Sequence, residues 1–95
     1  MSIILEIPKH EYVYGTEDFF MIYDRFPLSP SNMLIILKNV QTDYFDLTPE
    51  AKAILRQLFV KARFIIEEHY QPDGYNIGMN CGLAARKTVI HFDCQ

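Results

Sequence analysis

The sequence has no tryptophan, only two cysteines, Cys81 and Cys94, and no apolar run long enough to cross a membrane. Two cysteines without a secretory signal pattern predict reduced thiols in a cytoplasmic protein rather than a disulfide framework. Apolar runs such as Met33–Leu37 are far shorter than the ~20 residues that a transmembrane helix needs. We therefore expect a cytoplasmic protein without a membrane span.

Basic residues are also scarce. Nine Lys and Arg residues stand against twelve Asp and Glu residues, which gives a formal net charge of −3. A nucleic-acid polymer is bound through many contacts between Lys or Arg side chains and phosphates, and this sequence has no basic excess to supply them. The charge balance excludes a nucleic-acid polymer as partner but is compatible with a small phosphate ligand.

The apolar content is sufficient for one packed core. Hydrophobic residues make up 49% of the 95 residues and charged residues 22%, as is typical of a globular chain. This length predicts a single domain over residues 1–95, because a second core has no room. A domain this small buries about two-thirds of its unfolded surface, so a homodimer interface would be a natural addition to its stability.

Secondary structure is indicated by short apolar runs and one long amphipathic segment. The helix is expected to start after Thr48, a good N-cap that precedes Pro49, and to run to about Tyr70. Strands on both sides of one helix, without βαβ alternation, predict an α+β fold with an antiparallel sheet of about five strands. The predicted strands are Tyr12–Tyr14, Phe19–Tyr23, Met33–Leu37, Tyr75–Met79 and Thr88–Cys94.

The last predicted strand carries a histidine and a carboxylate two residues apart. Alternation along a strand places His91 and Asp93 on one face, with Phe92 and Cys94 on the other. Such a pair could exchange protons or bind a metal, or it could be an ordinary surface or interface pair. No CxxC or HxxxH spacing accompanies it, so we expect no metal site.

Two further features could bind a ligand or could be ordinary surface structure. The loop after Asn80 ends in Arg86 and Lys87, whose charges could hold a phosphate together with backbone amides. The P-loop pattern is absent, so a tight turn with two solvated cations is the alternative. Asp24 is either a surface carboxylate at a strand end or a ligand for a pair of hydroxyls, and the local pattern leaves both open.

Three segments in order resemble the histidine triad (HIT) family of nucleotide hydrolases and transferases. They are similar to its opening strands, its approach to the long helix, and the strand and loop before its signature. The segments are Glu17–Ile36, Asp43–Glu50 and Asp73–Gly82. The resemblance extends over roughly residues 7–95. It implies a HIT-like fold, a homodimer whose two sheets join, and one nucleoside monophosphate site on each protomer.

The resemblance also implies roles for individual residues. Asp24 matches the acidic residue that binds the ribose hydroxyls, and Asn80 and Thr88 match polar groups near the α-phosphate. His91 matches the first histidine of the His-φ-His-φ-His triad. The residues implied to line the base pocket are Phe19, Ile22 and Phe26.

The departures from the family pattern gather where the phosphorus chemistry takes place. Asp93 falls at the second histidine, the family's nucleophile, and Gln95 at the third. The family's Pro-Gly-His step ends here in Asn32, and its Gly-Gln before the last strand reads Arg86-Lys87. The two cations add positive charge to the phosphate side, which favours binding rather than turnover.

A carboxylate at the nucleophile position changes the expected chemistry. A neutral imidazole nitrogen can attack phosphorus, whereas the Asp93 carboxylate repels a phosphate dianion by on the order of 4 kcal/mol at about 4 Å and an effective dielectric of about 20. We therefore expect a nucleotide-binding protein without the family's hydrolysis and without a cofactor. The alternatives are a scaffold that retains only the fold, or a phosphohydrolase or nucleotidyl transferase that uses Asp93 or His91.

Overall fold

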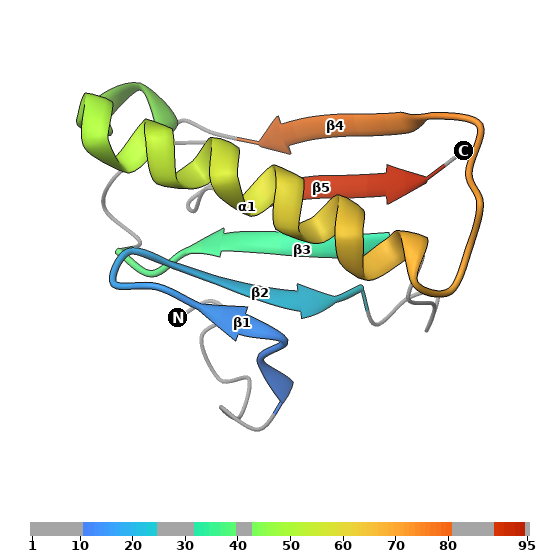
Figure 1. Ribbon diagram of the computed structural model, residues 1–95. Helices are drawn as coiled ribbons and strands as arrows, with labels where there is room; N and C mark the ends of the chain where they lie inside the picture. The colour runs from blue at the N-terminus through green and yellow to red at the C-terminus, as the bar shows by residue number, and fades with distance from the viewer. Residues whose placement is uncertain (1–10, 25–31, 40–42, 81–88, 95) are drawn as a thin grey trace.

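The computed structural model describes residues 11–24, 32–39, 43–80 and 89–94. These residues form one sheet with a long helix, α1, lying across one of its faces (Figure 1). The elements in chain order are β1 (Tyr14–Gly15), β2 (Phe19–Tyr23), β3 (Asn32–Leu37), a 3₁₀ helix (Tyr44–Asp46), α1 (Pro49–Glu67), β4 (Tyr75–Asn80) and β5 (Val89–Cys94).

The sheet has five strands in the order β1-β2-β3-β5-β4, and every neighbouring pair is antiparallel. This confirms the predicted α+β class and the antiparallel sheet of about five strands. The last strand, β5, lies inside the sheet between β3 and β4, and β4 forms an edge (Figure 1). Residues from distant parts of the chain therefore meet on β3, β5 and β4.

The first hairpin is shorter than predicted. Its first strand begins at Tyr14 rather than Tyr12, and the turn closes where the Thr16 backbone N–H donates to the Phe19 carbonyl oxygen at 2.8 Å. The Tyr12 ring instead stacks on the Phe20 ring, with centroids 4.3 Å apart. This packing, rather than a strand ladder, holds Tyr12 against the sheet.

Helix α1 begins as predicted and ends earlier. The Thr48 hydroxyl accepts a hydrogen bond from the Ala51 N–H at 3.1 Å, and Pro49 occupies the first turn, where no backbone donor is needed. The helix stops at Glu67 instead of Tyr70, because the His69 backbone N–H donates to the Ile66 carbonyl oxygen, three residues back, instead of to the carbonyl oxygen four residues back. The chain tightens into a turn there, before Pro72. In the described part of the chain, no helix is both long and apolar enough to cross a membrane.

The main core lies between α1 and the sheet. One stripe of the helix contacts alternating side chains of β2, β3 and β5, as the helical and strand periods require. Phe92 lies at its β5 side, with its ring centroid 6.1 Å from that of Phe59 and 5.2 Å from that of Tyr75. The buried members are Phe19, Met21, Met33, Ile35, Leu37, Ala51, Leu55, Leu58, Ala62, Ile66, Ile90 and Phe92.

A second apolar cluster lies on the face of the sheet that α1 does not cover. Its buried residues are Phe20, Ile22, Ile36 and Val89, and Tyr12 and Leu34 pack against them. The two clusters use alternate residues of the same strands, so they identify which face each strand position occupies. The second face is the one that carries the candidate site.

Candidate functional site

His91 and Asp93 lie on the sheet face opposite α1. Their strand, β5, places Ile90 and Phe92 in the core beneath the helix and Val89 in the second cluster. Because side chains alternate along a strand, His91 and Asp93 share the face of Val89. Both side chains are half-buried, so they are held by neighbours yet remain accessible to a ligand.

Strand pairing gives these two residues small and polar neighbours, together with one apolar side chain, Leu34, which is opposite His91 on β3. Asp93 is opposite Asn32 of β3 on one side and Asn76 of β4 on the other. Its strand neighbour His91 is opposite Gly78. We call Asn32, Asn76, Asn80, His91 and Asp93 the polar cluster.

The His91 ring has a polar partner from the edge strand. The side-chain nitrogen of Asn80, Nδ2, lies 3.4 Å from His91 Nε2. In the neutral tautomer with its proton on Nδ1, the ring accepts this hydrogen bond through Nε2. The contact would then fix the ring orientation and direct the Nδ1 proton away from Asn80.

Gly78 leaves open space beside His91. Among the described residues, and apart from Gly78 and its two chain neighbours, no heavy atom lies within 4 Å of the position that a Cβ atom would take at Gly78. A side chain would fit there, and so can part of a small molecule. The β4 side of the polar cluster is therefore open to a ligand that approaches His91.

Asp24 lies at the same end of the sheet as Asp93. Its backbone N–H donates to the Asn32 carbonyl oxygen at 2.9 Å, immediately after β2. Since Asn32 is the register partner of Asp93, this bond places Asp24 one strand beyond that pair. The residue implied for the ribose contact thus lies at the Asp93 end of β5, whereas Asn80, implied for a phosphate contact, is opposite Val89 at the other end of that strand.

The implied base pocket needs a correction. Ile22 belongs to the second cluster, on the face of the polar cluster, whereas Phe19 is fully buried beneath α1. Residues three apart on one strand point to opposite faces, so Phe19 cannot line a pocket together with Ile22. Phe20 takes that face instead, stacked with Tyr12. Several of the residues singled out in the sequence lie outside the described ones: Phe26, Cys81, Arg86, Lys87, Thr88 and Gln95.

Sequence reasoning missed Asn76. The signal was present, because Asn76, Gly78 and Asn80 alternate along one strand and therefore share a face. What the sequence did not supply was the register that puts Asn76 beside Asp93. Among the described residues, no three His, Cys, Asp or Glu side chains group in a way that could hold a metal ion.

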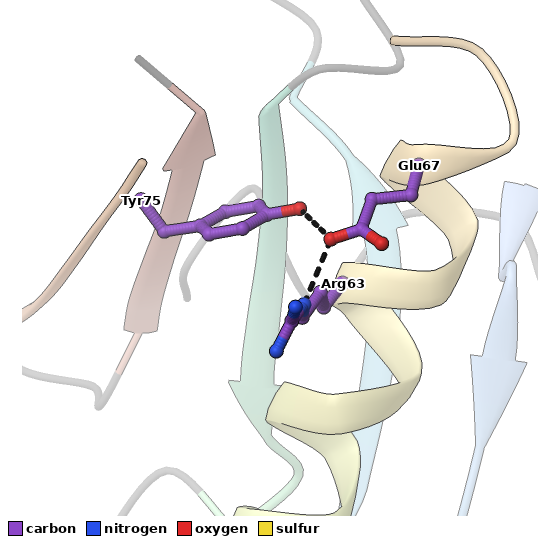
Figure 2. A network of polar contacts seen from close by, with 3 residues as sticks. All are labelled: Arg63, Glu67 and Tyr75. Carbon is purple, nitrogen blue, oxygen red and sulfur yellow. Dashed lines mark hydrogen bonds and ion pairs between the residues drawn. The ribbon is translucent and has the colours of Figure 1, made fainter. Parts of the chain in front are cut away.

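The edge strand is attached to α1 by a polar network (Figure 2). Glu67 Oε2 accepts hydrogen bonds from Arg63 Nε and from the Tyr75 hydroxyl, both at 2.7 Å. The bond from Arg63, followed by that from Tyr75, lowers the pKa of the Glu67 carboxyl, and Glu67 raises the pKa of Arg63. The network joins the end of the helix to the first residue of β4, the strand that carries Asn76 and Asn80.

Comparison with protein families decides the identity of the fold. A family model described as the HIT domain matches residues 5–92. The chain belongs to the HIT family. The order of its segments along the sequence and the arrangement of its sheet and helix agree with this assignment.

Individual HIT relatives support the same conclusion. A protein of Chlamydia muridarum described as an uncharacterized HIT-like protein is 36% identical over 86 residues, which cover 83% of this chain and 63% of the relative. A bis(5'-adenosyl)-triphosphatase of Dictyostelium discoideum is 28% identical over 85 residues, covering 90% of this chain and 57% of that protein. The chain therefore spans less than two-thirds of the length of both relatives.

A solved structure has the same architecture. The crystal structure of a HIT family protein from Bacillus anthracis superposes with a TM-score of 0.72 at 25% identity, covering 90% of this chain and 63% of that one. In this HIT fold, His91 and Asp93 lie on β5, an inner strand of the sheet, on the face opposite α1.

Proposed function

We propose that this HIT-family chain binds a nucleoside monophosphate on the polar cluster and does not cleave it by the family's route. The observation that carries the proposal is the placement of Asp93. It lies on the ligand-accessible face of β5, next to the His91–Asn80 pair and between Asn32 and Asn76. The activity for which the Dictyostelium relative is named, on a bis-adenosyl compound, supports a nucleotide as the ligand class.

The proposed binding mode follows the geometry of the face. The apolar second cluster offers Phe20 and Ile22 to a base, although both are largely buried and would contact it only at their edges. Asp24, at the end of β2, would accept hydrogen bonds from the two ribose hydroxyls. Asn80 and Thr88 would then donate to the phosphate, with Arg86 and Lys87 adding charge.

The lack of turnover follows from charge. The family's route requires a neutral nitrogen that attacks phosphorus, and we propose that Asp93 stands at that nitrogen's position. At about 4 Å and an effective dielectric of about 20, its carboxylate opposes a phosphate dianion by on the order of 4 kcal/mol. His91 does not replace the nucleophile, because its Nε2 already contacts Asn80.

We also propose that two copies pair through their β4 edges. An edge strand presents unpaired backbone donors and acceptors, and β4 additionally exposes Ile77 and Met79, at 46% and 37%. The outer side of α1 exposes Val60 and Phe64 as well. Such apolar surface is more typical of an interface than of a free face. We further propose that the protein acts in the cytoplasm.

An NMR titration tests the proposed binding. We expect AMP at millimolar concentration to shift the backbone amide signals of Asp24, Asn80 and Thr88 in the ¹⁵N-labelled chain. Replacing Asp24 with Asn should weaken AMP binding by about 10- to 100-fold, because a charged acceptor of two hydrogen bonds is lost.

The matched control is Asp18→Asn, which removes the same charge from an exposed turn before β2. This variant should bind AMP as the unaltered chain does. The absence of shifts at all three amides with AMP, GMP and adenosine would contradict the proposed function and favour a scaffold that retains only the fold.

A further inference from the structure

We propose that the Asp93 carboxylate and the Asn76 amide oxygen hold a Mg²⁺ ion that bridges the protein to the phosphate of its ligand. The nucleotide half of this proposal rests on the proposed function, whereas the ion site stands on the strand register. Asp93 and Asn76 are register partners on β5 and β4. Their side chains share the sheet face opposite α1.

The geometry permits one ion between the two side chains. Directly opposed residues of an antiparallel pair have Cβ atoms about 4.5–5.5 Å apart. An ion above their midpoint is therefore within reach of one oxygen from each side chain at the Mg–O distance of about 2.0–2.1 Å. Asn32 is the partner of Asp93 on β3, so it lies one strand farther from an ion held between β5 and β4. It would contact the ion through a bound water.

The chemistry of the polar cluster favours magnesium over zinc. Mg²⁺ takes oxygen ligands, keeps several waters, and is commonly bound by one or two carboxylates together with substrate phosphates. Zinc prefers nitrogen and sulfur ligands, and the Nε2 atom of His91 faces Asn80. Two protein oxygens and a phosphate oxygen, completed by water, form an octahedral magnesium shell.

The charged residues of the strands explain why an ion would bind at this place. Neither Lys nor Arg occurs in β2, β3, β4 or β5, and Asp93 is the only acidic residue in these four strands. These strands therefore present a phosphate with negative charge only, and positive charge has to come from outside them, from Arg86 and Lys87 or from an ion. An intervening divalent cation converts this repulsion into two attractive contacts. The same residue that prevents nucleophilic attack would then become the anchor of the ligand.

A calorimetric titration with AMP at constant ionic strength, with and without Mg²⁺, tests the bridge. In the unaltered chain we expect Mg²⁺ to raise the affinity for AMP at least tenfold. Asp93→Asn should bind AMP more tightly than the unaltered chain without Mg²⁺ and should gain nothing when Mg²⁺ is added. Asn76→Ala should lose most of the gain, and Asp18→Asn should retain it.

A second measurement probes the ion alone. Substoichiometric Mn²⁺ without nucleotide should broaden the amide signals of Asn76 and Asp93, and Asp93→Asn should abolish this broadening. Equal broadening in that variant would overturn the ion site, even if AMP fails to bind under any condition. Tight AMP binding that ignores Mg²⁺ would also overturn it, while the proposed function would stand with Arg86 and Lys87 as the source of charge.

Discussion

Replacing Phe92 with Ala should lower the free energy of unfolding by about 3–5 kcal/mol. The Phe92 side chain is 3% exposed and lies in the core beneath α1, where its ring contacts those of Phe59 and Tyr75. Truncation removes the apolar contacts and leaves a cavity between the helix and β5, because the surrounding side chains relax only partly into the space. Equilibrium urea denaturation followed by circular dichroism measures the change.

The control for this substitution is Phe45→Ala. Phe45 is 74% exposed on the short 3₁₀ helix, so the same truncation there should change the free energy of unfolding by no more than about 0.5 kcal/mol. A small domain has little stability to spare, so both variants are best compared at about 10–20 °C, where stability is typically greatest. Similar losses in the two variants would show that Phe92 is not part of a well-packed core.

Replacing Ile77 with Lys should dissociate the proposed dimer. Ile77 is exposed on the edge strand β4, and the substitution would place a charge inside an interface built on that edge. The cost should be at least about 3 kcal/mol, which corresponds to a dissociation constant raised by about 100-fold. Analytical ultracentrifugation over a range of protein concentrations measures the dissociation constant.

The matched control places the same charge elsewhere. Phe45→Lys also exchanges an exposed apolar side chain for lysine, but away from the sheet edge. It should leave the dimer intact. A monomeric unaltered chain at all concentrations, or an Ile77→Lys variant that dimerises as well as the control, would contradict pairing through β4.

Much of the fold followed from local sequence signals. Thr48 and Pro49 determined the helix start, because capping depends on neighbouring residues alone. Apolar runs located the strands, and β2 has the predicted bounds Phe19–Tyr23. The 3₁₀ helix after Asp43 went unpredicted, although Asp43 and Asp46 form a reciprocal capping box with each other's backbone.

The errors arose where a side chain's surroundings depend on distant parts of the chain. Tyr12 has strand-like character but stacks on Phe20. Family resemblance grouped Phe19 with Ile22, whereas strand alternation separates them. The second error is avoidable, because the odd spacing of these two residues along one strand is visible in the sequence itself.

The polar cluster was only half predictable. His91 and Asp93 share a face because they are two residues apart on one strand. Their neighbours Asn32 and Asn76 come from other strands, and only the order β3-β5-β4 brings the three strands together. Pairing between segments so distant in sequence is determined by tertiary packing, which local patterns do not encode.

The central claim is that Asp93 leaves a face that binds a nucleotide without cleaving it. The most direct measurement is ³¹P NMR of AMP-morpholidate incubated with the purified chain, with and without Mg²⁺. We predict that the protein shifts or broadens the substrate signal and that no AMP signal grows. Steady growth of AMP that stops in Asp93→Ala would contradict the claim.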